Sequence, residues 1–321
     1  MCGIVGYLGN RVAQDALIDG LRRLEYRGYD SAGVAFHDGN AFSLAKETGR
    51  VENLAATLRE SNPTSTLGIA HTRWATHGAV TVSNTHPHLS HDGKIALVHN
   101  GVIENYGPLK RILEGKGIEF SSETDSEVLS NLIAYHYARL EGEEDRFAQA
   151  LREALSQCRG AYGIAVLCVD EPGFLLGARR GSPLVVGLGD GETFLASDAS
   201  AFVGRVRDAV YLKDGEIALL REDGFRIITM QGEDAQAVSQ PIDQTVEDVE
   251  MGDFDSFMEK EIFEQPVALE NTLRGRFGDD GTTAKLGGLE GHEDELRRLD
   301  RIVFVACGTA RHSCMVGEYL I

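Results

Sequence analysis

A cysteine stands at position 2 of the chain, directly after the initiator Met1. A small second residue generally permits removal of the first methionine, and Cys2 would then carry both a thiol and a free α-amino group. An α-amine with an ordinary pKa of about 7.7–8.0 can accept the proton of the thiol, directly or through one water molecule. Cys2 is therefore a candidate nucleophile that needs no catalytic histidine. Taken alone, it can also be an ordinary small residue beside a strand.

Acyl transfer by a thiolate also requires hydrogen-bond donors at the place where the oxyanion develops. The segment VHNG at 98–101 follows an apolar run and offers the amide of Asn100 and the backbone N–H of Gly101. Asn-Gly is also the commonest dipeptide of tight turns. The residues alone therefore leave open an oxyanion hole or a simple turn at this position.

The opening heptapeptide MCGIVGY resembles the start of the N-terminal-nucleophile glutamine amidotransferases, in which a cysteine attacks the side-chain amide of glutamine. A narrower resemblance, to the glucosamine-6-phosphate synthases (glutamine–fructose-6-phosphate aminotransferases, isomerizing), rests on five further segments: LEYRGYDSAG at 24–33, HTRWATHG at 71–78, HPH at 86–88, VHNG at 98–101 and SETDSE at 122–127. Phosphoribosyl-pyrophosphate amidotransferases and asparagine synthetases share the Cys-Gly-Ile opening but lack the tryptophan-containing segment.

The resemblance implies roles for individual residues. It makes Cys2 the nucleophile and assigns the oxyanion hole to Asn100 and Gly101. Glutamine presents an α-carboxylate, which suits the bidentate fork of an arginine, and an α-ammonium, which needs a fixed anion. By resemblance, Arg73 binds the carboxylate with help from Thr76 and His77, and Asp125 binds the ammonium. Trp74 would gate the passage of ammonia. A surface ion pair for Arg73 and a helix N-cap for Asp125 remain the alternatives from the residues alone.

Histidines and tyrosines near these motifs have less certain roles. A metal site would need a carboxylate in ligand register, and HPH suits a rigid loop, so we expect neither a metal nor a cofactor. Tyr26 and Tyr29 follow the exit of a predicted helix, where packing and a role in the pocket are both open. The clustered histidines are His71, His77, His86, His88, His91 and His99.

The elements that must position these residues can be predicted from periodicity. A buried strand at 4–8 precedes a helix with apolar residues at helical spacing from Val12 to Leu24, and helices are expected near Ser126 and at 146–158. Grouped strands and helices without regular alternation favour an α+β fold. The resemblance implies that this fold is a four-layer αββα N-terminal-nucleophile hydrolase sandwich. The other predicted strands are 67–70, 95–98, 164–169, 174–178, 193–196, 216–220 and 225–229.

The C-terminal quarter of the chain is predicted as a linker and the start of a second domain. We place a glutaminase domain at 2–230, a polar acidic linker at 231–252 and a partial, truncated α/β sugar isomerase (SIS) domain at 253–321. A helix at 256–273, a strand at 302–306 and a turn before a last helix are expected there. KEIFEQP at 260–266 and VACGT at 305–309 resemble the entry to this domain, and the resemblance implies that Gly308 and Thr309 bind a sugar phosphate. Ala310 departs from the serine of many relatives and leaves the phosphate contacts open.

Composition excludes several other classes of protein. A formal net charge of -19 repels phosphates at long range, so we expect no nucleic-acid or membrane partner. Five cysteines without a CxxC pair indicate a reducing compartment, and no segment predicts a membrane span, so a cytoplasmic location is expected. Seven lysines against 24 arginines suggest a salt-rich cytoplasm. An enzyme activity that already falls at salt concentrations below that of seawater would contradict this hypothesis.

The resemblance predicts the function of a glutamine amidotransferase of amino sugar synthesis. The expected partners are L-glutamine and, in the complete enzyme, fructose 6-phosphate, which ammonia would convert to glucosamine 6-phosphate in a homodimer. The chain as given is expected to hydrolyse glutamine without making the amino sugar. A stand-alone glutaminase, a non-catalytic glutamine-binding module and an amidotransferase for another acceptor are the alternatives.

Overall fold

A computed structural model gives the three-dimensional structure of the chain. It describes residues 2–74, 79–140, 142, 145–222, 224–242, 245–249, 252, 254–278, 284–289, 291–306 and 308–321. The chain divides into two compact units, Met1–Glu250 and Met251–Ile321.

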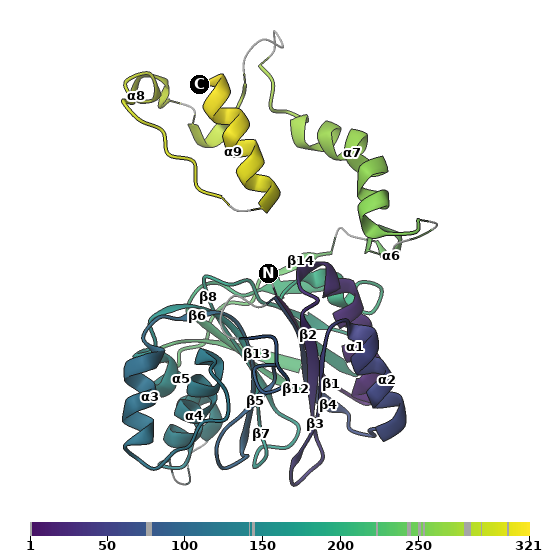
Figure 1. The fold of residues 1–321 in the computed structure, drawn as a ribbon, viewed down its shortest axis with the longest axis vertical. Helices are drawn as coiled ribbons and strands as arrows, with labels where there is room; N and C mark the ends of the chain where they lie inside the picture. Colours follow the sequence, from purple (N-terminus) through teal and green to yellow (C-terminus); the bar gives the residue numbers. More distant parts are fainter. Residues whose placement is uncertain are drawn as a thin grey trace. The chain divides into compact units, whose positions relative to one another are not determined.

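The first unit is built on two antiparallel sheets (Figure 1). Every strand pair within each sheet runs antiparallel, in the part of the unit that the structure describes. The larger sheet has the order β14 (Ser239–Pro241), β11 (Asp208–Tyr211), β9 (Val185–Leu188), β10 (Glu192–Ala196), β1 (Gly3–Gly9), β4 (Leu67–Arg73), β2 (Ser31–His37) and β3 (Phe42–Thr48). The smaller sheet has the order β13 (Gly224–Thr229), β12 (Glu216–Arg221), β8 (Leu175–Arg180), β7 (Gly160–Cys168), β6 (Ile95–Ile103) and β5 (His88–Leu89).

Helices cover the outer face of each sheet (Figure 1). One apolar cluster joins the larger sheet to its helices, a second joins the smaller sheet to its own, and a third fills the space between the sheets. The unit is thus layered helix, sheet, sheet, helix, as predicted. On the larger sheet lie α1 (Ala13–Leu24), α2 (Val51–Ser61) and the short η2 (Ala199–Phe202); on the smaller sheet lie α3 (Tyr106–Glu114), α4 (Asp125–Tyr137) and α5 (Arg146–Gln157).

The alternation of side chains along β1 decides where its first residues point. Ile4 and Leu8 belong to the cluster between the sheets, whereas Val5 and Tyr7 pack toward α1. Because side chains alternate with a period of two, Cys2 continues the series that faces the second sheet. The sequence pattern therefore places the thiol in the inner space of the sandwich.

The same alternation directs residues of β4 and β6 to that space. Leu67 and Ile69 of β4 face inward, and His71 and Arg73 continue their series. In β6 the inward series leads through Val98 to Asn100. Three strands from two sheets thus bring their polar ends to one place.

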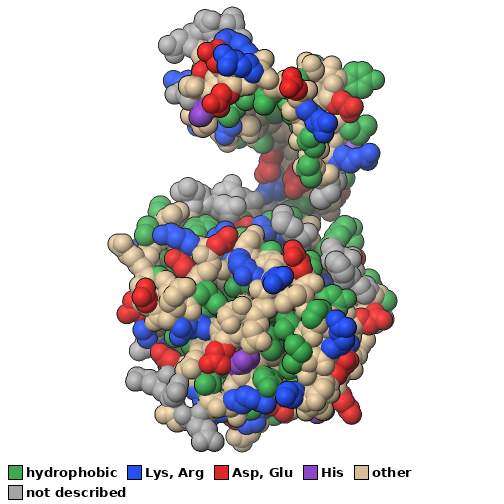
Figure 2. Space-filling view, turned by 90° about the vertical axis from the view of Figure 1, so that its left-hand side faces the viewer, with side chains coloured by type: hydrophobic (Ala, Val, Ile, Leu, Met, Phe, Trp, Pro, Cys, Tyr) green, Lys and Arg blue, Asp and Glu red, His purple; other side chains and the backbone are tan. Residues whose placement is uncertain are grey.

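Several elements of the first unit differ from the prediction. The strands β2, β3, β5, β9 and β11 and the helices α2 and α3 were not expected from periodicity. Part of the predicted linker, Ser239–Pro241, forms β14 and pairs with β11, and Val246–Val249 forms the short helix α6. Figure 2 shows acidic and basic side chains interspersed with hydrophobic ones over the visible face of this unit.

The second unit is helical in the part that the structure describes. As predicted, a helix α7 (Phe257–Leu273) begins after Ser256, whose side chain accepts a hydrogen bond from the N–H of Glu259, and it contains Pro266. The prediction of a strand at 302–306 is wrong. These residues do not form a strand, and none of the described strands pairs with them. The remaining elements are η3 (Gly287–Leu289), α8 (Glu293–Leu296) and α9 (Gly308–Leu320).

None of the helices in the described residues has the length and apolarity that crossing a membrane would require.

Candidate active site

The thiol of Cys2 lies against the backbone of Trp74. The N–H of Trp74 donates to Cys2 Sγ at 3.2 Å, and the thiol lies 3.7 Å from the carbonyl oxygen of the same residue. Gly28 packs closely on the same backbone, because a Cβ there would lie 2.8 Å from Arg73 and Trp74. Burial raises the pKa of the Cys2 thiol, more than the backbone hydrogen bond at Trp74 lowers it. The nucleophile therefore needs a base to form its thiolate at neutral pH.

Asn100 and Gly101 lie within a strand next to Cys2. The side-chain Nδ2 of Asn100 donates to the carbonyl oxygen of Cys2 at 2.9 Å, and its Oδ1 lies 3.0 Å from Nε2 of His71. Both residues are paired with β7, so the alternative of an Asn-Gly turn is wrong. Gly101 has a φ of 132°, and a Cβ there would overlap the carbonyl oxygen of Ala161. Only glycine fits this close approach of two strands.

Arg73 is not a surface residue, because only 5% of it is exposed. Its Nη1 donates to the carbonyl oxygen of Ala79 at 3.1 Å. The guanidinium is thus held in a buried position at the end of β4, where a carboxylate could pair with it through two parallel hydrogen bonds. The alternative of a surface ion pair is therefore wrong.

Asp125 is the first residue of α4 but does not cap it. The cap is Thr124, whose side chain accepts a hydrogen bond from the N–H of Glu127 at 3.2 Å. Asp125 Oδ2 instead accepts a hydrogen bond from the N–H of Ile103 at 2.7 Å, at the end of β6. This bond ties the carboxylate to the strand that carries Asn100, so the N-cap alternative is wrong.

A small pocket of about 50 Å³ joins these residues. A cavity needs roughly 10–15 Å³ of volume to hold one buried water molecule, so the pocket has room for a few of them. Thr76 and His77 lie outside the described residues. Tyr26 and Tyr29 do not line the pocket; Tyr29 packs edge-on against Trp74, with ring centroids 5.5 Å apart. The lining residues are Cys2, Arg73, Trp74, His86, His99, Gly101, Thr124, Asp125 and Ser126.

Four buried histidines surround this pocket. The rings of His71 and His86 stack with centroids 4.2 Å apart, and His88 packs on His86 at 4.7 Å. Burial lowers the pKa of His71 to about 3 and that of His86 and His88 well below the ordinary value, and it lowers the pKa of His99 as well. All four are neutral at neutral pH. In the described part of the chain, no three histidine, cysteine or carboxylate side chains have a metal-binding arrangement.

The sequence pointed to none of His71, Thr124 or Ser126 as parts of this site. His99 Nδ1 lies 2.9 Å from Ser126 Oγ, and His88 Nε2 lies 3.1 Å from Thr124 Oγ1. The signal for His71 was its place in the inward series of β4, two residues before Arg73. This position indicates a role in the site only when it is known which strand of the other sheet faces β4.

Comparison with known proteins identifies the family. Residues 71–204 match the family described as a glutamine amidotransferase domain. The glutamine–fructose-6-phosphate aminotransferase (isomerizing) of Chlorobaculum tepidum is 46% identical over 329 residues, covering 100% of this chain and 52% of that protein. A protein of the same name from Thermus thermophilus is 47% identical over 321 residues, covering 100% of this chain and 51% of the relative. The chain belongs to the glutamine amidotransferases.

This glutamine amidotransferase spans about half the length of the curated relatives it matches. The predicted resemblance to their family is confirmed. A solved structure of glutamine phosphoribosylpyrophosphate amidotransferase from B. subtilis superposes with a TM-score of 0.60 at 26% identity, covering 71% of this chain and 49% of that one. A structure described as the allosteric regulatory enzyme of purine biosynthesis gives 0.60 at 27%, with the same coverage. These matches confirm the α+β fold of the N-terminal-nucleophile type.

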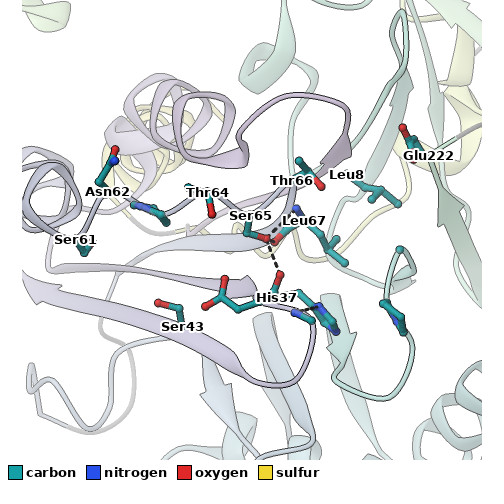
Figure 3. Close-up of a pocket in the computed structure, with 15 residues that line it drawn as sticks. Leu8, His37, Ser43, Ser61, Asn62, Thr64, Ser65, Thr66, Leu67 and Glu222 are labelled. Carbon is teal, nitrogen blue, oxygen red and sulfur yellow. Dashed lines mark hydrogen bonds between the residues drawn. The ribbon is translucent and has the colours of Figure 1, made fainter.

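A larger pocket of about 610 Å³ lies at the opposite end of β1 in this amidotransferase (Figure 3). The buried polar groups described there are satisfied within the protein. Ser65 Oγ lies 2.7 Å from the carbonyl oxygen of His37 and accepts from the N–H of Leu67, while both ring nitrogens of His37 have backbone partners. The side chains of Ser65 and His37 thus already have partners, and we assign no site to this pocket.

The sugar-phosphate residues predicted in the amidotransferase's second unit cannot be placed in a site. Gly308 is the first residue of α9 and Thr309 follows it, but their side chains lie outside what the structure describes. Their role stays a prediction.

Proposed function

We propose that the first unit hydrolyses L-glutamine through a thioester on Cys2. The observation that carries this proposal is that Cys2, Gly101, Arg73 and Asp125 line one pocket, with Asn100 hydrogen-bonded to the backbone of Cys2. This set combines a nucleophile, oxyanion donors, a cation and an anion.

The reaction begins with the removal of Met1, which frees the α-amine of Cys2. The amine accepts the thiol proton, and the thiolate attacks the side-chain carbonyl carbon of glutamine. Asn100 Nδ2 and the N–H of Gly101 stabilise the oxyanion. Its collapse breaks the C–N bond, and the leaving nitrogen takes a proton from the α-ammonium and departs as ammonia. Water then attacks the γ-glutamyl thioester and releases glutamate and the thiol.

Substrate recognition follows from the charges at the pocket. Arg73 pairs with the α-carboxylate of glutamine, and Asp125 binds the α-ammonium. Thr76 and His77 assist Arg73, and Trp74, which is 43% exposed beside the nucleophile, controls the exit of ammonia.

In the complete enzyme the released ammonia converts fructose 6-phosphate to glucosamine 6-phosphate. The names of the relatives from C. tepidum and T. thermophilus support this acceptor. In this proposal residues 253–321 begin the sugar isomerase domain, and Gly308 and Thr309 contribute to its phosphate site.

The test uses intact-mass measurement and an electrophilic diazoketone analogue of glutamine. We expect the purified chain to lack Met1, to gain one analogue on Cys2 and to release ammonia from glutamine. Cys2→Ala should abolish both labelling and ammonia release while leaving the thermal unfolding temperature unchanged. Full activity with Met1 retained would overturn the proposal, as would glutamine binding without turnover in a chain that lacks Met1.

A further inference from the structure

His71 contacts the side chain that we assign to the oxyanion hole, although it does not line the pocket itself. Its Nε2 lies 3.0 Å from Asn100 Oδ1, across the gap between the two sheets. Only 1% of His71 is exposed, and its ring stacks on His86. The His71 ring is therefore held by stacking on His86, and the contact is shielded from water.

The two hydrogen bonds of Asn100 determine which way its amide points. Nδ2 faces the carbonyl oxygen of Cys2, which can only accept, so Oδ1 must face His71. An acceptor at Oδ1 requires that His71 carry its proton on Nε2. The flipped amide would set two carbonyl oxygens against each other and would require the opposite tautomer.

The other ring nitrogen supports the same tautomer. Nδ1 of His71 is buried and has no partner in good hydrogen-bonding geometry among the described residues, although the backbone of His99 is close enough to raise the pKa of the ring slightly against the effect of burial. An unpaired acceptor nitrogen in that position costs less free energy than an unpaired N–H donor, which native structures rarely bury.

We propose that His71, as a neutral Nε2–H donor, is a positioning residue that holds the Asn100 amide with its N–H groups toward the reacting carbonyl of glutamine. This inference rests on the proposed function, because it acts through the oxyanion role of Asn100. Burial keeps the pKa of His71 at about 3, so the donor form persists over the whole range of an activity assay. His71 itself takes no part in proton transfer.

The test compares two substitutions of different chemistry. His71→Gln keeps an amide N–H near the place of Nε2, whereas His71→Leu keeps the bulk and removes the donor. We expect His71→Leu to lower kcat for glutamine hydrolysis by about 10–100-fold with KM within about twofold, since a misplaced catalytic group can cost that much. His71→Gln should recover most of kcat.

A double-mutant cycle separates this inference from the proposed function. Asn100→Ala alone should lower kcat by about 10²–10³-fold, as expected for a lost oxyanion donor. In that background His71→Leu should change kcat by less than about twofold, because its partner is already gone. If Asn100→Ala has no effect, the proposed oxyanion hole is wrong. If Asn100→Ala has its effect but His71→Leu is neutral or fully additive, only the role of His71 is wrong.

A second readout does not depend on activity. Nitrogen chemical shifts of ¹⁵N-histidine-labelled protein, assigned with His71→Gln, should show a neutral ring protonated at Nε2 across the neutral pH range. A ring protonated at Nδ1 would overturn the inference even if His71→Leu failed to fold.

Discussion

At the scale of single residues, the central question is how a buried thiol becomes a thiolate. Burial raises the pKa of Cys2, and the four histidines around the pocket are neutral and already hydrogen-bonded or stacked. In the proposed mechanism the α-amine of Cys2, freed by the removal of Met1, therefore serves as the base. The base would then be the main-chain amine of Cys2 and not a side chain.

Blocking that amine gives a first prediction. An uncleaved peptide extension joined to Cys2 keeps the thiol but converts the amine to an amide, which cannot accept a proton. General-base catalysis typically contributes 10²–10⁴-fold, so we expect ammonia release to fall by at least about 10²-fold. Stopped assays of ammonia from glutamine measure this, with thermal unfolding as the control for folding. Undiminished turnover by the extended protein would show that another group takes the proton.

Arg73 gives a second prediction, because its planar fork and a lysine ammonium differ in geometry. Arg73→Lys keeps the charge but loses the second parallel hydrogen bond to a carboxylate. We expect KM for glutamine to rise by about tenfold or more, with a smaller change in kcat. The matched control is Arg50→Lys, whose side chain is 70% exposed. Equal effects of both substitutions on KM would contradict the assignment.

Much of the candidate site could be predicted from motifs. Cys2, Arg73 and Asp125 stand in short segments that resemble those of glutamine amidotransferases, and the structure brings these residues to one pocket. His71 could not be assigned a role in this way. Its contact joins β4 of one sheet to β6 of the other, and sequence spacing carries no information about how two sheets are stacked.

At the scale of elements, β2 lies against the loop that carries the HPH segment. A Cβ at Gly33 would overlap the carbonyl oxygen of His86 and lie 3.1 Å from that of Ala45. Two backbone segments meet here, and neither can move aside as a side chain could.

This crowding gives a third prediction. Gly33→Ala should lower the free energy of unfolding by about 1–3 kcal/mol, the usual cost of overpacking, measured by denaturant titration. Gly107→Ala in α3 is the control, since nothing lies within 4 Å of its added methyl group. If Gly33→Ala unfolded at the same denaturant concentration as the wild-type protein, β2 and the loop would be less closely packed than the structure indicates.

The elements differ in how far periodicity could predict them. β1, β4, β6 and α1 carry clean apolar patterns because each is buried against a defined layer. β3 lies at the edge of its sheet, where its side chains are mostly exposed or half-buried, so the apolar signal is weak. The apolar run at 302–306 shows the reverse error, since a strand pattern forms no strand when none of the described strands pairs with it.

At the scale of the whole molecule, the buried histidines link stability to pH. Each is neutral in the folded state and has an ordinary pKa near 6.5 when unfolded, so the unfolded chain binds more protons below that pH. Stability is therefore fully present above pH 6.5 and is lost as the pH falls toward the depressed folded values.

The fourth prediction puts a size on this effect. The free energy of unfolding of the first unit should fall by roughly 1 kcal/mol per pH unit below about 6.5 for each of His71, His86 and His88. Unfolding temperatures measured from about pH 7.5 down to about pH 5 should show the steepest decline below the ordinary histidine pKa, and His88→Gln should flatten it. His292→Gln, at an exposed position, should not. A flat profile would mean that these rings are already protonated in the folded protein.

The central place of β1 has a consequence for biosynthesis. This strand is synthesised long before one of its two neighbours, β10, which begins only at Glu192. At synthesis rates of about 5–20 residues per second, the ribosome needs roughly 10–40 s to reach that point. During this interval β1 is not yet enclosed by its sheet, so the removal of Met1 that we propose has time to occur before Cys2 is buried.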